Sequence, residues 1–291
     1  MSNLLQRILV AAVGIPIVLY VCFKPLSLLG LAILFAVLAV HEFYGLAKAK
    51  GFAVQSGIGM TLTALIVLSF AHFRLPLHLQ TTEVLPLILI AGTIATLAFE
   101  LFKGYPNPLV QVSLTLAGAV YVGMGLGGFY GVHEYFFIRA GMDNATTAVS
   151  AISQEAGYFT IVMLVSIWIC DSAAFFVGRA FGKHKIAKSV SPNKSWEGGT
   201  AGVVGAIATW FVAQSVLAPL ASLSTTTLIV MGIIAGVFGQ IGDFAESMLK
   251  RDAGVKDSST LIPGHGGVLD RLDSILFVAP IAYLYLHIFG A

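Results

Sequence analysis

Long, uninterrupted runs of apolar residues are the feature that most constrains how this chain of 291 residues can fold. Residues 84–102, for example, contain a single charged side chain, Glu100. A run of about 20 apolar residues is long enough to cross the hydrocarbon core of a bilayer as a helix. Only 10% of all residues are charged, against about 25% in soluble domains. Lipid must therefore surround most of the chain, and disorder is excluded by the same composition.

Nine such runs predict nine transmembrane helices, so we expect an all-α polytopic membrane protein. Arg7 before the first run resembles the start of a secretion signal, but no small-residue cleavage site follows. We therefore interpret the first run as a membrane helix. The expected spans lie near residues 8–23, 26–46, 57–73, 84–102, 109–131, 158–178, 199–221, 225–248 and 269–289.

Lysine and arginine are distributed unevenly between the two sides that these spans define. If the N-terminus is inside, thirteen of the 16 basic residues lie in inside segments, and only Lys24, Arg74 and Arg139 lie outside. Cytoplasmic loops carry an excess of Lys and Arg. We therefore expect a cytoplasmic N-terminus and an external C-terminus in a bacterial inner (plasma) membrane.

The two halves of the chain differ in their charged residues. Residues 1–157 are predicted to form a scaffold of transmembrane helices, whereas residues 158–291 carry most of the basic residues and most of the intramembrane acids. We expect any chemistry in the second half, at the cytoplasmic face. Cys22 and Cys170 lie inside apolar runs and are interpreted as buried hydrophobic residues, with neither a disulfide nor a zinc site.

The first polar cluster lies in residues 239–250. Asp243, Glu246, Ser247 and Lys250 follow helical i, i+3, i+4, i+7 spacing and form one polar stripe. A carboxylate in the membrane costs roughly 2.5–3.5 kcal/mol even on the mildest scale, so it is rarely kept without a use. This favours a functional role for Asp243. For Glu246 a structural pairing with a basic residue is an equally good interpretation.

The second cluster is the link into the last span. A glycine-rich turn between two helices would explain Gly266 and Gly267, but not so many charged residues in one short link. Clustered carboxylates can hold Mg²⁺, and Lys and Arg can neutralise phosphate charge, so this composition is typical of phosphoryl transfer. The charged or ionisable residues of the link are Lys250, Arg251, Lys256, Asp257, His265, Asp270, Arg271 and Asp273.

The third cluster extends over residues 179–197. Its bases could serve only as a topology signal or an attraction to anionic lipid. Its hydroxyl, amide and glycine groups nevertheless suit a loop that contacts a nucleotide, although no P-loop pattern is present. Upstream, Asp171 lies inside the sixth span, where it is either a metal ligand or a partner for a base. The expected substrate-binding residues here are Arg179, Ser191, Asn193, Lys194, Ser195 and Glu197.

The link resembles the signature of the phosphatidate cytidylyltransferases, also called CDP-diglyceride synthases. The segments 170–185 and 191–199 resemble parts of the same family, so the resemblance covers roughly residues 158–291. The signature positions are filled here by Ser247, Lys250, Arg251, Lys256, Asp257, Ser259, Ile262, Pro263, His265, Gly266, Gly267, Asp270, Arg271 and Asp273.

The resemblance implies a Mg²⁺-dependent attack of a phosphatidate phosphate oxygen on the α-phosphorus of CTP, giving CDP-diacylglycerol and pyrophosphate. It implies Asp243 and Asp270 as metal ligands, with Asp171 and Asp257 as weaker candidates, and leaves a second cation open. CTP, phosphatidic acid and membrane lipids are the implied partners, nucleic acid is not, and a homodimer is left open. The implied phosphate contacts are Lys194, Lys250, Arg251, Lys256 and His265, and Arg271 is a further expected substrate-binding residue.

Two other functions fit part of the pattern. An ion-coupled transporter would also carry intramembrane acids, but these should spread through the membrane midplane and accompany a repeat between halves. Another cytidine-nucleotide lipid phosphotransferase, of the CDP-alcohol type, would carry a D-G-x2-A-R-x8-G-x3-D-x3-D pattern, which is absent here. A purely structural membrane protein would not need the charged link at all.

Overall fold

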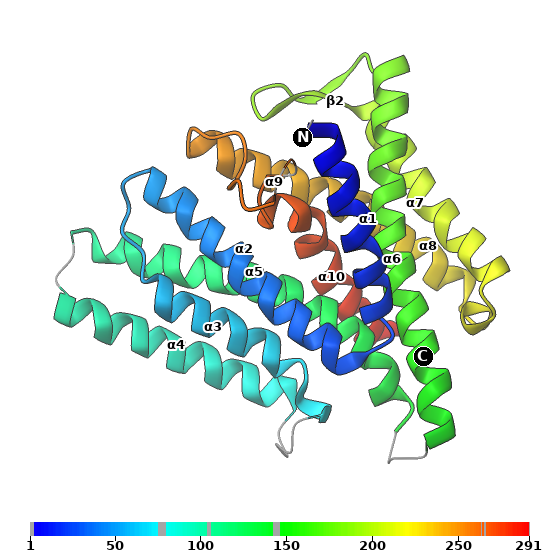
Figure 1. Ribbon diagram of the computed structural model, residues 1–291, viewed down its shortest axis with the longest axis horizontal. Coiled ribbons are helices and arrows are strands. Elements are labelled where there is room, and N and C mark those ends of the chain that lie inside the picture. The colour runs from blue at the N-terminus through cyan, green and yellow to red at the C-terminus, as the bar shows by residue number, and fades with distance from the viewer. Residues whose placement is uncertain are drawn as a thin grey trace.

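The computed structural model describes residues 3–74, 80–103, 106–141, 146–262, 264 and 266–290. It confirms the predicted all-α membrane fold: long helices make up almost the whole chain, and one small hairpin is added to them (Figure 1). In Figure 1, α4 lies at one outer edge of the bundle and α7 and α8 lie at the other. The helix α10 runs through the middle, behind α1.

The first half of the chain folds into five helices and one turn of 3-10 helix. Proline stands in the first turn of α2 and of α5, where its missing N–H removes no helical hydrogen bond. These elements are α1 (Asn3–Val21), α2 (Pro25–Ala49), α3 (Ser56–Ser69), η1 (His72–Arg74), α4 (Thr81–Lys103) and α5 (Pro108–Arg139).

The second half contains the longest helix and a span that changes its helical type part-way along. The elements α8, η3 and α9 follow one another without a break, and η3 is a π-helix of five residues. The elements are α6 (Thr146–Phe181), β1 (Lys185–Ala187), β2 (Ser191–Ser195), α7 (Trp196–Val216), η2 (Ala218–Leu220), α8 (Thr225–Ile233), η3 (Ile234–Phe238), α9 (Gly239–Asp252) and α10 (Leu269–Phe289).

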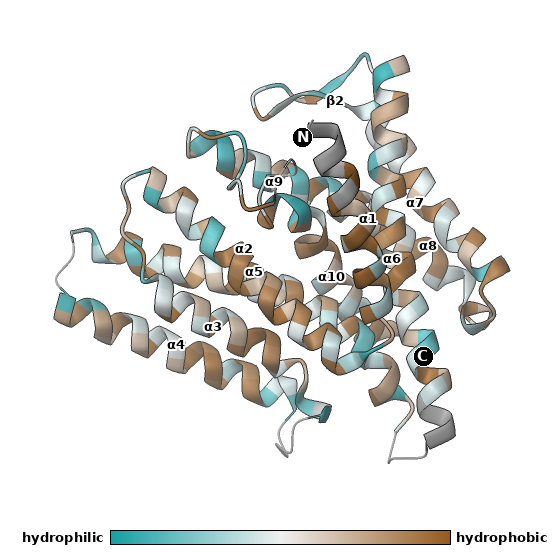
Figure 2. Cartoon of the chain, viewed as in Figure 1, coloured by the Kyte–Doolittle hydropathy of each residue, from teal (hydrophilic) through white to brown (hydrophobic). Residues whose placement is uncertain are grey.

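Each of the nine predicted spans coincides with a helical segment, but the segments differ in length. Within the described residues, seven helices are long and apolar enough to cross a membrane: α2, α4, α5, α6, α7, the continuous α8–α9 segment and α10. The apolar part of α1 (Val10–Val21) and α3 (Ser56–Ser69) are shorter. Apolar residues cover the long helices, and polar residues gather at the helix ends and on the hairpin (Figure 2).

The core lies where α5 packs on α2, α3 and α10. The Tyr44 hydroxyl, fully buried there, donates a hydrogen bond of 2.6 Å to the main-chain carbonyl of Thr115. Small residues let the helices of the second half approach closely: the sulfur of Cys170 would lie 2.8 Å from a Cβ placed at Gly202 of α7. This is the small-residue packing that membrane helices favour.

The segment that the sequence assigned to a nucleotide loop forms an antiparallel hairpin of β1 and β2 between α6 and α7. Ser195 ends the hairpin and caps α7, because its hydroxyl accepts a hydrogen bond of 3.3 Å from the N–H of Gly198. Glu197 in the first turn of α7 accepts bonds from the N–H groups of Lys183 and His184. The hairpin is therefore fastened at its base to the N-terminus of α7.

Candidate active site

A cavity of about 730 Å³ lies where α6, β2 and α9 meet. Two carboxylates, Asp171 of α6 and Asp243 of α9, line it together with Lys194 of β2 and Arg179 near the end of α6. The structure therefore brings together four residues that the sequence singled out, from three separate segments. The size of the cavity is within the range of small-molecule sites, which is roughly 300–1,000 Å³.

Lys194 is the counter-ion of Asp243. Its ammonium group donates a hydrogen bond to the Asp243 carboxylate and lies 4.4 Å from the ring centroid of Phe244. The hydroxyl of Ser247 donates a weaker bond of 3.3 Å to the same carboxylate. About a third of each side chain of the pair is exposed, 29% for Lys194 and 32% for Asp243, so both can meet a ligand in the cavity.

A third carboxylate, Asp273 near the start of α10, lies within electrostatic range of Asp243 and Asp171. Gly242 makes this possible, because a Cβ at this position would overlap the main-chain carbonyl of Asp273. We call Asp171, Asp243 and Asp273 the open cluster. Like charges this close repel one another, and Lys194 is the base that interacts with all three.

The π-helix η3 lies directly before α9 in the chain. Just after it, the side-chain amide of Gln240 donates hydrogen bonds to the carbonyls of Gly236 at 2.6 Å and Gly199 at 3.0 Å. The first of these carbonyls belongs to η3 and the second to α7. A π-helical turn inside an α-helix is frequent at functional sites. Gln240 thus joins the α8–α9 span to α7 at the wall of the cavity.

A second group of carboxylates lies deeper, under the link between α9 and α10. Glu42 of α2 is only 4% exposed and accepts hydrogen bonds from the N–H groups of Val268 and Leu269, at 3.0 and 2.8 Å. It also accepts bonds from the hydroxyls of Ser258 and Ser259, at 2.9 and 2.6 Å. One carboxylate of the first half therefore holds both ends of the charged link.

Asp270 and Glu246 share Lys250 in the same place. The Lys250 ammonium group lies 2.5 Å from Glu246 and 2.6 Å from Asp270, and both carboxylates are almost completely buried. Asp270 also accepts bonds from the N–H groups of Gly267 at 2.7 Å and Ser258 at 3.0 Å. We call Glu42, Glu246 and Asp270 the closed cluster.

The resemblance implies that Asp243 and Asp270 ligate the same metal ion. The structure gives the two carboxylates different partners: Lys194 and Ser247 for Asp243, and Lys250, Ser258 and Gly267 for Asp270. That both ligate one ion stays a prediction. The structure instead brings Asp243 to the same cavity as Asp171, which the sequence ranked below Asp270.

The other predicted residues of the hairpin lie in two places. Asn193 and Ser195 line the cavity, although Ser195 is 2% exposed and is engaged as a helix cap. Ser191 pairs with Ala187 at the turn end of the hairpin. Glu197 lines a neighbouring cavity and holds the His184 ring nitrogen at 2.6 Å, so its contacts fasten the hairpin.

Apart from Lys250 and Asp270, the predicted site residues of the link that the structure describes are exposed. The Arg251 side chain donates a bond of 3.2 Å to the carbonyl of Val255, and Lys256 and Asp257 face solvent. Arg271 borders a separate apolar cavity. His265 lies outside the described residues. Direct phosphate contacts from these side chains stay predictions.

Sequence reasoning missed Glu42 and did not assign a role to Asp273. Glu42 lies beside His41 within the expected span 26–46, and an acid inside an apolar run is costly, so the same rule that selected Asp171 could have found it. The sequence analysis identified Asp273 only as a charged residue of the link and a position of the signature. Its position beside Asp243 depends on how α9 and α10 pack.

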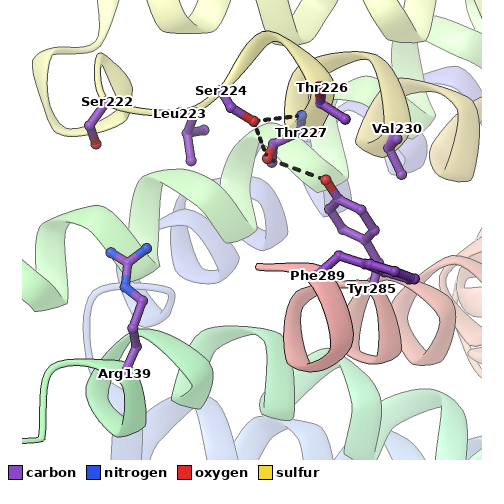
Figure 3. A pocket seen from close by; sticks show the side chains of 9 residues that line it. All are labelled: Arg139, Ser222, Leu223, Ser224, Thr226, Thr227, Val230, Tyr285 and Phe289. Carbon is purple, nitrogen blue, oxygen red and sulfur yellow. Dashed lines mark hydrogen bonds between the residues drawn. The ribbon is translucent and has the colours of Figure 1, made fainter. Parts of the chain in front are cut away.

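Another cavity, of about 540 Å³, lies at the opposite end of α10, near Phe289 (Figure 3). Its polar groups mostly satisfy one another: the Tyr285 hydroxyl donates to Thr227 at 3.3 Å, and the Ser224 hydroxyl accepts from the N–H of Thr227 at 3.1 Å. None of its described lining residues is a carboxylate. The open cluster is therefore the better candidate for chemistry.

The profile of the cytidylyltransferase family matches residues 5–289, which is nearly the whole chain. The chain belongs to this family. It is 42% identical over 134 residues to a phosphatidate cytidylyltransferase of Haemophilus influenzae, a match covering 45% of this chain and 46% of the relative. It is 32% identical over 274 residues to the chloroplastic phosphatidate cytidylyltransferase 5 of Arabidopsis thaliana, covering 87% of this chain and 64% of the relative.

A phosphatidate cytidylyltransferase of Staphylococcus haemolyticus matches at 29% identity over 286 residues, which is 93% of this chain and 96% of the relative. The first two matches each span less than two thirds of the relative's length. The match to the family profile covers both halves of the chain, including α2 with Glu42.

Proposed function

We propose that this protein is a phosphatidate cytidylyltransferase, which converts CTP and phosphatidic acid to CDP-diacylglycerol and pyrophosphate. The observation that carries the proposal is the cavity of about 730 Å³ in a membrane protein of the cytidylyltransferase family, where Asp171 and Asp243 of the open cluster lie together with the basic side chains Lys194 and Arg179. Such a site can hold the charged phosphates of a nucleotide next to the bilayer in which the lipid substrate is dissolved.

The residues of the open cluster fit a Mg²⁺ ion. Among the described residues no three His, Cys, Asp or Glu side chains form a ready-made metal cage. Mg²⁺ does not need one, because it is commonly bound by one or two carboxylates, substrate phosphates and water. We assign Asp171 and Asp243 as its carboxylate ligands. When bound, Mg²⁺ would offset the charge of both substrates' phosphates.

The chain's own residues supply positioning. Lys194 and Arg179 neutralise the phosphates of CTP, and the hairpin holds Lys194 at the rim of the cavity. An oxygen of the phosphatidate phosphate then attacks the α-phosphorus, the bond to the β-phosphate breaks, and pyrophosphate leaves. Phosphoryl transfer of this kind depends mainly on positioning and electrostatics, so no covalent nucleophile is required.

The membrane orientation belongs to the same proposal. The excess of Lys and Arg in the segments 179–198 and 249–268 supports a cytoplasmic active site, where CTP is available. Cysteines introduced at Lys188 and Ser258 should react with an impermeant thiol reagent only after cells are permeabilised. Labelling of either position from outside intact cells would contradict the orientation.

The activity is tested by incubating the purified protein in detergent with labelled CTP, phosphatidic acid and Mg²⁺. We expect the label to move into a lipid-soluble product, together with release of pyrophosphate. Replacing phosphatidic acid by diacylglycerol is the control, because it removes the attacking phosphate. A protein that folds and binds CTP but forms no labelled lipid would refute the proposed activity.

A further inference from the structure

An apolar cavity of about 240 Å³ lies next to the open cluster, among α1, α2, α5, α6 and α10. Its wall is formed by apolar side chains from all five helices, and the single charged residue that borders it is Arg271. The residues that the argument uses are Leu31, Ala32, Phe35, Leu164, Trp168 and Arg271.

The two cavities share the helix α6. Asp171 lines the polar cavity, Trp168 lies one turn away and lines the apolar one, and Leu164 continues that wall a further turn along. These residues run from the hairpin end of α6 towards its middle. The wall therefore changes from carboxylate to hydrocarbon within two helical turns.

The helix α10 also contributes to both regions. Asp273 belongs to the open cluster, and Arg271, two residues earlier, borders the apolar cavity. A guanidinium group can bind a phosphate through two parallel hydrogen bonds. The apolar cavity thus has a side chain of phosphate-binding type on its border, two residues before Asp273 of the open cluster.

We infer that this apolar cavity is the subsite for one acyl chain of the phosphatidate substrate, with Arg271 next to its phosphate. The inference rests on the proposed function. A lipid whose phosphate reaches the open cluster must place its chains deeper in the membrane, and Trp168 and Leu164 line the path in that direction.

The subsite acts on specificity more than on affinity. Lipid tails are as apolar as leucine, so moving a chain from the bilayer into the cavity gains little free energy. A cavity of fixed shape can still discriminate between chains, because one methylene in an apolar pocket changes kcat/KM roughly 10- to 200-fold. Chains that the cavity does not accommodate would hold the phosphate away from the open cluster.

Binding can be measured without turnover, because Trp168 is one of three tryptophans and lies in the cavity wall. The protein is placed in phosphatidylcholine nanodiscs containing a small fraction of phosphatidate with brominated acyl chains, which quench tryptophan fluorescence on contact. Brominated phosphatidylcholine at the same fraction is the reference, and the Trp168→Phe variant isolates the signal of Trp168. We expect brominated phosphatidate to quench Trp168 more strongly than the reference.

The matched variants fill the cavity or leave it unchanged. Ala32→Phe places a ring in the cavity and should abolish the preferential quenching, and Leu31→Phe, a smaller change at the same wall, should weaken it if the first variant does not fold. Leu34→Phe adds the same ring to the exposed face of α2, where Leu34 is 53% exposed, and should behave as wild type. Arg271→Gln should remove the preference for phosphatidate.

Turnover provides the second measurement. For Ala32→Phe, kcat/KM for dioleoyl phosphatidate should fall by about tenfold or more, while the value for dihexanoyl phosphatidate changes little. Equal losses with both lipids, or turnover in wild type without preferential quenching of Trp168, would overturn the subsite. Preferential quenching without any labelled lipid product would instead refute the proposed activity and leave an anionic-lipid site.

Discussion

The open and closed clusters are built from the same kind of side chain, yet their surroundings differ. Asp243 has Lys194 and a weak bond from Ser247, and it lines a cavity of about 730 Å³. Glu42 accepts four hydrogen bonds from the link and is 4% exposed. A carboxylate has about four acceptor positions, so Glu42 is saturated, and Asp243 keeps room for a further ligand.

The two clusters therefore differ in accessibility: the closed cluster is enclosed by the link, and the open cluster borders a cavity. Carboxylates of the closed cluster, with Lys250 between two of them, hold the link in one conformation. Two carboxylates of the open cluster, Asp171 and Asp243, line a cavity. Gly267 is required by the closed arrangement, since a Cβ there would overlap the Ser258 hydroxyl and the Glu42 carboxylate.

The largest expected effect is that of Asp243→Asn. This change keeps the size of the side chain but removes an anionic group from the open cluster, so turnover should fall about a hundredfold to a thousandfold, as for other groups that stabilise transition-state charge. The Mg²⁺ concentration required for half-maximal rate should rise. Steady-state kinetics over a Mg²⁺ titration measures both effects.

Asp252→Asn is the matched control for this prediction. Asp252 ends the same helix and forms an exposed ion pair with Lys50 at 2.7 Å, away from the cavity. Its removal should leave kcat and the Mg²⁺ dependence within twofold or so of wild type, as is usual for surface pairs. Wild-type turnover of Asp243→Asn at limiting Mg²⁺ would remove the distinction between the two clusters.

The second effect concerns stability and tests the closed cluster. Glu42→Gln leaves the link donors with a neutral acceptor, and loss of charge-assisted hydrogen bonds of this kind costs about 2 kcal/mol in the free energy of unfolding. Thermal unfolding in detergent should show a lower midpoint. The Mg²⁺ dependence of the remaining activity should match wild type, because Glu42 does not line the open cavity.

The matched control for Glu42→Gln is a substitution at another buried carboxylate of the first half, Glu100. Glu100 is 6% exposed and accepts one bond of 2.7 Å from Gln55, remote in sequence from the link. Glu100→Gln should lower the midpoint less than Glu42→Gln and leave kcat unchanged. If Glu42→Gln instead shifted the Mg²⁺ requirement at normal stability, the closed cluster would itself be part of the metal site.

The third effect is on nucleotide binding. Lys194→Ala removes the counter-ion of Asp243 and a phosphate contact, so the KM for CTP should rise about tenfold, the equivalent of one charge-assisted bond. The KM for phosphatidic acid should change much less. Lys188→Ala, which removes an exposed lysine of the same hairpin that does not line the open cavity, is the control. Equal KM values for CTP in the two variants would reduce the hairpin to a topology signal.

The smallest effect is expected for Glu197→Gln. Its contacts with Lys183 and His184 fasten the hairpin at the surface, so their loss should loosen the hairpin without unfolding the bundle. We expect no resolvable change in the unfolding midpoint and a rise in the KM for CTP that is smaller than that of Lys194→Ala. A larger effect than that of Lys194→Ala would place Glu197 in contact with the nucleotide.

The sequence by itself determined the membrane environment, the helical fold and the half of the chain that carries the charged segments. These properties follow from local patterns: a run such as 84–102 is apolar wherever it packs, and Asp243 and Lys250 share a helix face by their spacing alone. The same patterns identified Asp171, Asp243 and Lys194, which the fold brings to one cavity.

Only the tertiary structure decided which carboxylates face a cavity and which are enclosed by hydrogen-bond donors. Glu42 meets Ser258 across 216 positions of sequence, and Asp273 reaches the open cluster because Gly242 lets α9 and α10 touch. The role of an acid depends on how many donors surround it and whether a cavity adjoins it. Both are set by contacts between distant segments, which neither spacing nor composition specifies.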